Sequence, residues 1–408
     1  MPADNPVHPI AIAWVSAGGT GAQNYDEFAD PAEITAVVAA APDSVLAVEM
    51  PHCTPAARAA GATFPESLPA AAERLRRLKR DGRFHRHTDL VAPYRITSAE
   101  ATAYGLLVMV DTDQISTSGG HPGRVIRNED VFAATVAQRV ELIGALRHLL
   151  SPVLLLAADA GAELDALLPA VVAGLGSPAV TDTDPAGRTH EVWLMPAGGE
   201  RDRLLAAAGA GRLIVADGNH RSLAAQQAGL PRFLGLVTTP GSLGIRPYNR
   251  LVERIGMADP ELLRRLAAAG AVVTPAPPGW AGPEQPGVVG LTLSGGRHTV
   301  RLPAITTGTV VDRLDHSVVE RVVLGDVLGL APDDPGVRYI GGDYPASWLD
   351  AEVAAGRAEA AIAIAPVPMA DFVAVNLQRL KMPRKSTWFT PKARAGLVLA
   401  ELPGEAAD

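Results

Sequence analysis

The sequence predicts a mixed α+β fold in which helices flank several sheets. Of the 408 residues, 48% are hydrophobic and 20% are charged, so the chain can bury a sizeable core and global disorder is excluded. Short apolar segments of strand length alternate irregularly with amphipathic segments of helix length, and no repeat of fixed period is present. At roughly 150 residues per domain, two or three domains fit this length. We expect an N-terminal α/β region over residues 1–150 and a second region over 151–408, with a Pro- and Gly-dense linker or insertion at 275–287.

The N-terminal half alternates predicted strands with predicted helices. Residues 10–15 form an apolar run typical of a buried strand, and Asp30-Pro31 is typical of a helix start. The clearest helix covers 129–150, because apolar residues recur there at three-to-four spacing. The other predicted strands are 44–48, 91–96, 105–110, 153–157 and 190–194, and the other predicted helices are 69–80 and 162–173.

The C-terminal half continues the same alternation. A predicted strand over 212–216 leads into a helix over 221–228, which Gly229 and Pro231 end. Gly295-Gly296 indicates a hairpin between two strands. The predicted strands are 233–237, 288–293, 298–302 and 360–365, the predicted helices are 259–268, 315–328, 345–355 and 371–380, and a basic loop is predicted over 381–392.

Charge and composition exclude several function classes. The net charge of −8 argues against a general nucleic-acid coat, and 4% aromatic residues argue against a stacking platform for single strands. Cys53 is the one cysteine of the sequence, so neither an intrachain disulfide nor a cysteine metal cluster can form. The first residues do not resemble a signal peptide, and the longest uncharged stretch, 166–181, is broken by Pro and Gly. We expect a soluble cytoplasmic protein without nucleic-acid or membrane partners, and a homodimer is compatible with these observations.

The strongest local signal is the run Asp217-Gly218-Asn219-His220-Arg221 between a predicted strand and a predicted helix. Gly218 allows a tight turn or a close approach to a ligand. The amides and dipole at a helix start favour an anion, and an arginine fork bonds two phosphate oxygens. Beside a phosphate, Asp217 would ligate Mg²⁺ or orient a hydroxyl. An ordinary helix start, with Asn219 as the cap and Arg221 in a surface pair, explains the same residues equally well.

Three further polar segments are weaker candidates. Residues 381–392 carry four cations and three hydroxyls that would clamp an anion, although a solvated basic loop is the commoner outcome. Glu129 would act as a base or a metal ligand if it faces a cleft, and otherwise as a capping acid. The polar cluster 246–250 would line a pocket, or form a turn that exposes Tyr248.

Residues 217–221 and 382–392 together resemble a large bacterial and archaeal family without a settled function. That family is similar to ADP- or ATP-dependent free serine kinases of the ParB/sulfiredoxin-like superfamily. One family pattern reads approximately D-G-H-H-R, and residues 217–221 depart from it at Asn219. The other reads approximately M-P-x-K-S-T-x-F-x-P-K, and residues 382–392 match it at every fixed position. A family His-Glu pair at the start of a long helix corresponds to residues 128–129, which read Asn-Glu, with Arg139 downstream. A Tyr-Asp pair near the family's start corresponds to residues 25–26.

The resemblance covers about residues 10–403 and implies a ParB/sulfiredoxin-like nucleotide-binding core with ATP or ADP and Mg²⁺ as cofactors. It implies a nucleotide site made of Gly218, Asn219, His220, Arg221, Ser222, Lys385, Ser386, Thr387 and Lys392. It implies catalytic roles for Glu129, Asp217 and His220, with Asp217 as the metal ligand. We expect a small hydroxy amino acid to contact Arg127, Tyr248, Asn249 and Arg250.

Three functions fit these expectations. The first is a Mg²⁺-dependent kinase that transfers a phosphoryl group from ATP or ADP to the hydroxyl of free serine or a serine-like metabolite. The second is a nucleotide-binding regulator without transfer activity, because Asn128 and Asn219 stand where the family has histidines. The third is an ATP-dependent ligase that activates a carboxylate on the same turn, and its amide product would distinguish it from a kinase.

Overall fold

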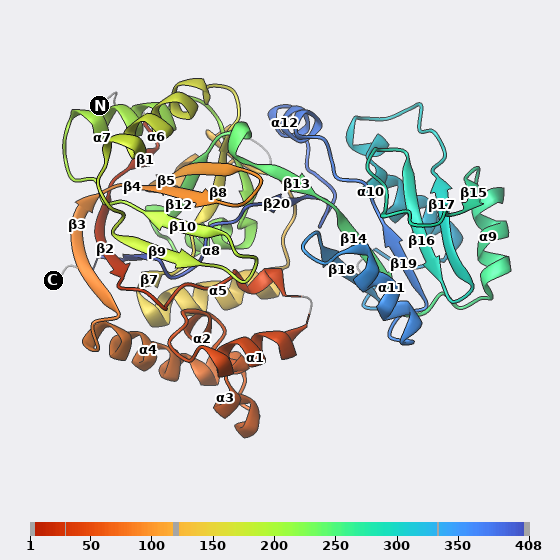
Figure 1. The fold of residues 1–408 in the computed structure, drawn as a ribbon, viewed down its shortest axis with the longest axis horizontal. Coiled ribbons are helices and arrows are strands. Elements are labelled where there is room, and N and C mark those ends of the chain that lie inside the picture. The colour runs from red at the N-terminus through yellow and green to blue at the C-terminus, as the bar shows by residue number, and fades with distance from the viewer. Residues whose placement is uncertain (1–4, 29, 117–121, 333, 404–408) are drawn as a thin grey trace. The chain divides into compact units, whose positions relative to one another are not determined.

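The structure is a computed structural model that describes residues 5–28, 30–116, 122–332 and 334–403 (Figure 1). The chain forms two compact units: unit 1 is Met1–Leu243 with Pro391–Asp408, and unit 2 is Gly244–Thr390. The expected boundary at residue 150 does not coincide with this division, because it falls inside unit 1. Within the expected linker, residues 276–287 contain neither helix nor strand and belong to unit 2. The mixed α+β class is confirmed in both units.

Unit 1 is built around a large mixed sheet. Its strands pair in parallel at β6–β11 and β8–β12, and the other neighbours are antiparallel. In sheet order the described strands are β6 (Val125–Arg127), β11 (Leu213–Asp217), β8 (Val153–Ala157), β12 (Arg232–Thr238), β5 (Thr102–Asp111), β4 (Ala92–Thr97), β10 (Thr189–Val192) and β9 (Val180–Thr183), with β1 (Val7–His8) also on β5. The expected strands at 91–96 and 105–110 are confirmed as the antiparallel neighbours β4 and β5.

A smaller antiparallel sheet in unit 1 joins the two ends of the chain. Its order is β3 (Phe84–Leu90), β2 (Ile10–Ser16), β21 (Val398–Glu401) and β7 (His148–Leu149). The pairing of β2 with β21 returns the C-terminal segment to unit 1. That return also carries residue 392 into unit 1.

The helices of unit 1 lie on two sides of its sheets (Figure 1). Apolar residues of α6 and α7 pack against the large sheet, and a second core lies among α1, α2, α4 and α5. The helices are α1 (Pro31–Ala40), α2 (Leu46–Glu49), α3 (Pro55–Ala60), α4 (Phe64–Arg80), α5 (Ala133–Leu146), α6 (Ala162–Gly174), α7 (Gly199–Ala208) and α8 (Asn219–Gln227). The short 3-10 turns are η1 (Tyr25–Glu27), η2 (Pro51–Cys53), η3 (Thr112–Gln114) and η4 (Pro240–Ser242).

Two of the secondary-structure elements expected in unit 1 differ from the structure. Residues 44–48 contain no strand, and 46–49 form α2 instead, because a short buried apolar run fits either element. The helix expected over 129–150 is shorter: α5 starts at Ala133 and ends before Arg147, whose positive φ of 54° breaks it ahead of β7. Apolar residues continue at helical spacing on both sides of α5, so their periodicity alone predicts a helix longer than the one observed.

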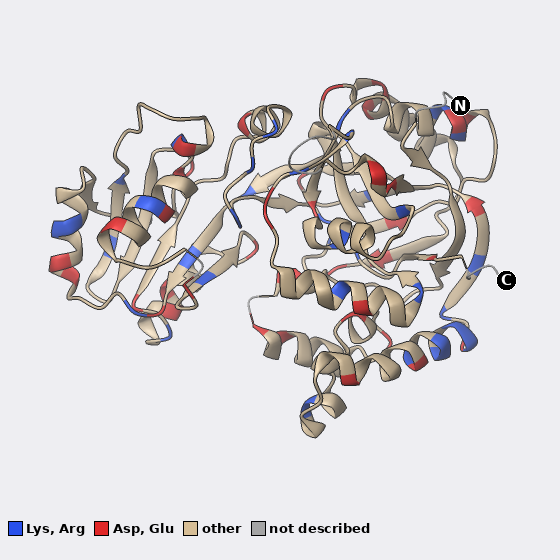
Figure 2. Ribbon diagram, turned by 180° about the vertical axis from the view of Figure 1, so that it is seen from behind, with Lys and Arg blue, Asp and Glu red and all other residues tan. Residues whose placement is uncertain are grey.

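The basic helix expected over 69–80 is confirmed as part of α4. Arg77, Lys79 and Arg80 lie in its last turn (Figure 2). Arg80 pairs with Glu73, and Arg77 lies 3.8 Å from Asp43, as expected of a solvated amphipathic helix. Among the described residues, no helix is long and apolar enough to cross a membrane.

Unit 2 contains an antiparallel sheet of described strands and a short two-stranded ladder. The sheet order is β15 (Val272–Pro275), β17 (Gly296–Arg301), β16 (Val288–Leu293), β19 (Ala360–Ala363), β14 (Tyr248–Val252) and β18 (Val337–Gly341), and the ladder pairs β13 (Gly244–Arg246) with β20 (Trp388–Thr390). The β16–β17 hairpin is confirmed. The helical segments are α9 (Asp259–Ala268), η5 (Val311–Arg313), α10 (Asp315–Val318), the π-helical η6 (Val319–Val327), α11 (Ala346–Ala354) and α12 (Met369–Leu377).

Candidate functional site

The turn between β11 and α8 requires a glycine. Gly218 has a φ of 95°, which L side chains rarely adopt. A Cβ atom at this position would lie 2.9 Å from Nε of Arg221, because the guanidinium of Arg221 folds back over the turn. The glycine therefore allows both the change of direction and the close approach of the arginine.

Two buried cations hold the carboxylate of Asp217. Nη2 of Arg221 donates to Oδ2 of Asp217, and Nζ of Lys392 lies 2.9 Å from Oδ1. Arg221 is 9% exposed and Lys392 is 8% exposed. The turn and the return segment, far apart in sequence, thus meet at one carboxylate.

Both cations keep their charge despite their burial. Burial opposes the charge on Lys392, but Asp217, Asp26 and Glu27 outweigh it and raise the pKa of Lys392 above its ordinary value. Burial likewise opposes the charge on Arg221, and Asp217 and Asp26 again raise its pKa. Arg221 and Lys392 are therefore positively charged at any physiological pH.

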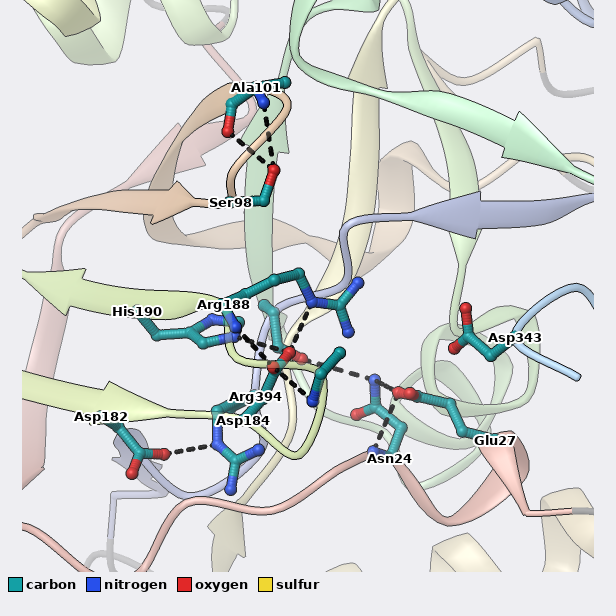
Figure 3. Close-up of polar contacts among 12 residues, drawn as sticks. Asn24, Glu27, Ser98, Ala101, Asp182, Asp184, Arg188, His190, Asp343 and Arg394 are labelled. Atoms are coloured by element: carbon teal, nitrogen blue, oxygen red, sulfur yellow. Dashed lines mark hydrogen bonds and ion pairs between the residues drawn. The ribbon is translucent and has the colours of Figure 1, made fainter.

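The η1 segment supplies a further carboxyl that the sequence analysis did not identify. Glu27 accepts hydrogen bonds through Oε1 from the main-chain N and the side-chain Nδ2 of Asn24, both at 3.0 Å (Figure 3). Asn24 in turn accepts from Nη1 of Arg221 at 2.8 Å. Burial raises the pKa of Glu27 to about 7, although Lys392 opposes the shift. The Asn-x-x-Glu spacing of a capping box is the one local signal in the sequence for these two residues, and it does not indicate their place beside the turn.

Arg139 forms a second buried layer beside η1. It is 3% exposed, and its guanidinium carbon lies 4.3 Å from the ring centroid of Tyr25. Its Nη1 donates to the main-chain oxygen of Glu49 at 3.3 Å. Burial raises the pKa of Tyr25 to about 12 and also raises the pKa of Glu49. Residues 25–26 and Arg139, which the resemblance matches to two elements of the family pattern, are therefore neighbours in the structure.

The two asparagines at family histidine positions contact each other. Nδ2 of Asn219 donates to Oδ1 of Asn128, and both side chains are buried. His220 is turned toward Phe132, whose main-chain N donates to Nε2 of His220 at 3.1 Å, and their rings stack. Asn219 is thus part of the helix, so the expectation of Asn219 as its cap is wrong, and Gly218 takes that position.

The remaining predicted residues of unit 1 lie around the same turn. Glu129 lies between β6 and α5, four residues before the helix starts, so a capping role in its first turn is excluded. Arg127 ends β6 and pairs with Val215 of β11, and burial lowers its pKa. Ser222 is buried, and its hydroxyl donates to the main-chain oxygen of Asn219 at 3.0 Å.

The other predicted site residues belong to unit 2, where three of them support the fold. Residues 248–250 begin the buried strand β14 (Tyr248–Val252), so the expected exposed tyrosine is not found, and a role of these residues in a pocket stays a prediction. Arg250 is 0% exposed and donates to Glu320 at 2.8 Å and to the main-chain oxygen of Lys385 at 3.0 Å. Oδ1 of Asn249 accepts from the main chain of Ile364 at 3.0 Å.

The basic loop also falls partly in unit 2. Lys385 has a φ of 51°, and its Nζ lies 5.5 Å from the ring centroid of Tyr248. Ser386 is 0% exposed, and its Oγ has no hydrogen-bond partner among the described residues. Thr387 precedes β20 and is half-buried. Nucleotide roles for Lys385, Ser386 and Thr387 therefore stay predictions.

The arrangement around Asp217 does not fit a protein-held metal ion. Both carboxylate oxygens of Asp217 are occupied, one by Arg221 and the other by Lys392. Within the described part of the chain, no group of three or more His, Cys, Asp or Glu side chains could hold a metal. Asp217 orients the two cations in this structure.

The family model described as a protein of unknown function, DUF1015, matches residues 21–317. The chain belongs to this family. The match includes η1, the β11–α8 turn and much of unit 2. The expected resemblance to a family without a settled function is thereby confirmed. No curated protein matches the chain in sequence.

Three solved structures show weak similarity to this DUF1015 protein. A mutant free serine kinase in complex with AMP has 11% identity and a TM-score of 0.39, over 71% of this chain and 92% of that chain. A conserved hypothetical protein from Pyrococcus furiosus has 12% identity and a TM-score of 0.37, over 71% and 95%. C-terminally truncated SbnI from Staphylococcus aureus has 13% identity and a TM-score of 0.37, over 71% and 87%. Similarity of this size assigns no activity to the chain.

Proposed function

We propose that this DUF1015 protein is a nucleotide-binding phosphotransferase that moves a phosphoryl group from ATP or ADP to the hydroxyl of a small serine-like molecule. The observation that carries the proposal is the convergence of Arg221 and Lys392 on Asp217 at the start of α8. The pattern of residues 382–392, which ends on Lys392, supports it independently.

The turn has the properties that a phosphate group requires. The first amides of any helix lack an acceptor within the helix, and the helix dipole places partial positive charge at this end of α8. Arg221 offers a planar fork for two oxygens and Lys392 offers a compact charge. Nε of Arg221 is buried and has no hydrogen-bond partner among the described residues, so one donor of the fork is uncommitted. A phosphate that binds here would share both cations with Asp217.

Glu27 has the properties of a general base for the acceptor hydroxyl. A base works best when its pKa is close to the working pH, and burial raises the pKa of Glu27 to about 7. Its ionised form would take the hydroxyl proton as the oxygen attacks the terminal phosphorus and the bond from that phosphorus to the leaving ADP or AMP breaks. Lys392 would stabilise the ionised form of Glu27. Since Glu129 was the base expected from sequence, the two glutamates are competing assignments. No step of the proposal depends on a protein-bound metal ion.

The contact between Asn128 and Asn219 favours a second function. Neither amide side chain titrates, so this pair does not carry a proton where the family patterns place histidines. A nucleotide-binding regulator without turnover would retain the two cations and dispense with that proton transfer. The resemblance alone supports the choice of acceptor, and the ligase remains a prediction of the sequence analysis.

The test is a product assay with the purified full chain, ATP or ADP, Mg²⁺ and a panel of hydroxy amino acids. A phosphotransferase yields a phosphorylated acceptor by mass spectrometry. Glu27→Gln should lower kcat by roughly 10²–10⁴-fold with little change in nucleotide affinity, whereas Glu129→Gln should retain most activity. The opposite ranking would reassign the base to Glu129. Tight nucleotide binding without any product would favour the regulator.

A further inference from the structure

A buried chain of hydrogen bonds connects the β9–β10 hairpin of unit 1 to the segment that carries Lys392. Tyr94 of β4 is 2% exposed, Asp184 in the turn after β9 is 6% exposed, and His190 of β10 is 0% exposed. Oη of Tyr94 lies 2.7 Å from Nδ1 of His190, and Nε2 of His190 lies 3.2 Å from Oδ2 of Asp184. At the other end, the main-chain N of Arg394 donates to Oη of Tyr94 at 3.1 Å. Figure 3 shows Asp184, His190 and Arg394 converging in this region.

Donor and acceptor roles along this chain are mutually consistent. Oη of Tyr94 receives the N–H of Arg394, so its own hydrogen is available for Nδ1 of His190. A neutral His190 then carries its proton on Nε2 and donates it to Asp184. Burial lowers the pKa of His190, although Asp184 opposes the shift, and the imidazole is therefore neutral at pH 7. Asp184 is fixed in turn by the main-chain N–H groups of Ala186 and Arg188 at 3.0 and 2.9 Å.

Further contacts hold the same return segment. Nη2 of Arg394 donates to the main-chain oxygen of Gly21 at 2.8 Å, and the Arg394 side chain pairs with Asp182 of β9. Ala395 exchanges two main-chain hydrogen bonds with Ala22, at 2.9 and 3.0 Å. The segment is thus held between the hairpin and the residues that precede η1.

We propose that Tyr94, His190 and Asp184 are positioning residues for Lys392. Tyr94 supplies the acceptor for the N–H of Arg394, and His190 and Asp184 hold the Tyr94 hydroxyl in place. The main chain two residues beyond Lys392 is thereby fixed, and the ammonium of Lys392 is held against Asp217. A packing role alone would be served by Phe and an aliphatic residue. Those residues would leave the N–H of Arg394 without this acceptor. The importance of this positioning for nucleotide binding rests on the proposed function, but the positioning itself is measurable without a ligand.

The test compares Tyr94→Phe with Tyr104→Phe, because each change removes one hydroxyl and retains the ring. Tyr104 lies on β5, opposite Arg95 of β4, and has no part in the hydrogen-bonded chain. The probe is the NMR signal of the Lys392 ammonium, identified by its loss in Lys392→Met. In the wild type the Lys392 side chain is buried in its ion pair, so we expect the ammonium protons to exchange slowly with water. Tyr94→Phe should accelerate their exchange by about tenfold or more, whereas Tyr104→Phe should leave it unchanged.

A double-mutant cycle separates this inference from the proposed function. Tyr94→Phe should weaken ATP or ADP binding several-fold in the wild type and have no effect in the Lys392→Met background. If the wild type binds no nucleotide but its ammonium signal responds to Tyr94→Phe, the positioning stands and the proposed function fails. If nucleotide binds and the signal does not respond, or responds equally to Tyr104→Phe, the inference is overturned. Should Tyr94→Phe fail to fold, Asp184→Asn is measured in the same way, and an unchanged signal there overturns the inference too.

Discussion

Arg221 in unit 1 and Arg250 in unit 2 are both buried, but they are satisfied by different kinds of partner. In unit 2, Arg250 donates to the main-chain oxygens of Tyr248 and Lys385, as well as to Glu320 of the π-helical segment. Its guanidinium carbon also lies 4.4 Å from the ring centroid of Tyr339. Carbonyl oxygens of strands and ordered loops do not rearrange for a ligand, so we interpret this cluster as structural.

In unit 1, Arg221 donates to the side chains of Asn24 and Asp217. Side chains change partners by rotating about single bonds, and a phosphate is able to replace or share them. The comparison teaches that burial and charge alone do not identify a ligand site. The two arginines differ in their partners: Arg250 is bonded mainly to main-chain acceptors that support the fold, whereas Arg221 is bonded to side chains at a helix start, where the proposed function places a phosphate.

The largest expected effect is a loss of stability in unit 2. Arg250→Ala removes the buried member of an ion pair whose other member, Glu320, is partly exposed, and it leaves four main-chain carbonyls without this donor. We therefore expect a loss of about 3–5 kcal/mol in unfolding free energy. Urea unfolding measures it. A loss below about 1 kcal/mol, or a selective loss of nucleotide binding with stability intact, would break the comparison between the two arginines.

The second effect concerns pH and Glu27. The pKa of Glu27 is about 7 in the folded chain and 4.5 as its ordinary value, so the folded state holds an extra proton between these pH values. The wild type should therefore lose stability as pH rises from 4.5 to 7, on the order of 2–3 kcal/mol through this group. Glu27→Gln should remove that loss in urea titrations at pH 5 and 8. Glu163→Gln, at the exposed start of α6, is the control and should retain it. Identical pH profiles for Glu27→Gln and the wild type would contradict the assignment.

The third effect concerns the turn itself. Gly218→Ala places a side chain at a φ of 95° and within 2.9 Å of Nε of Arg221. We expect a loss of about 1–2 kcal/mol in stability together with weaker nucleotide binding. Gly229→Ala has a similar backbone strain, at a φ of 69°, but no atom lies within 4 Å of the added Cβ. Gly229→Ala should lower stability without changing nucleotide affinity. If both changes altered nucleotide affinity equally, the turn at Gly218 would not be part of the nucleotide site.

The sequence alone predicts the turn but not the identity of its partners. Gly218 between an apolar strand and a helix is a local signal, and the β16–β17 hairpin is equally local. The contact between Lys392 and Asp217 depends on the return of the chain into unit 1, which no local pattern specifies. Arg250 shows the converse failure, since a polar cluster in the sequence forms a strand whose main-chain and side-chain partners lie far along the chain.

Glu27 was missed for a different reason. Its pKa of about 7 depends on burial and on the neighbouring charges of Lys392, Asp26 and Asp217. Burial of a carboxyl is a tertiary property. The spacing of Asn24 and Glu27 indicates only a local capping box, so the sequence gives no reason to place this carboxyl beside Lys392.

Isothermal titration of ATP and ADP into the wild type, Arg221→Ala, Lys392→Met and Arg212→Ala measures whether the two buried cations bind the nucleotide. Arg212 is a partly exposed arginine paired with Asp159 just before β11, and it serves as the matched control. We expect the wild type and Arg212→Ala to bind nucleotide equally well. Arg221→Ala and Lys392→Met should each lose about 1.5–3 kcal/mol of binding free energy, roughly tenfold to a hundredfold in affinity. A wild type that binds neither nucleotide, or affinities that do not differ among the four proteins, would contradict the account.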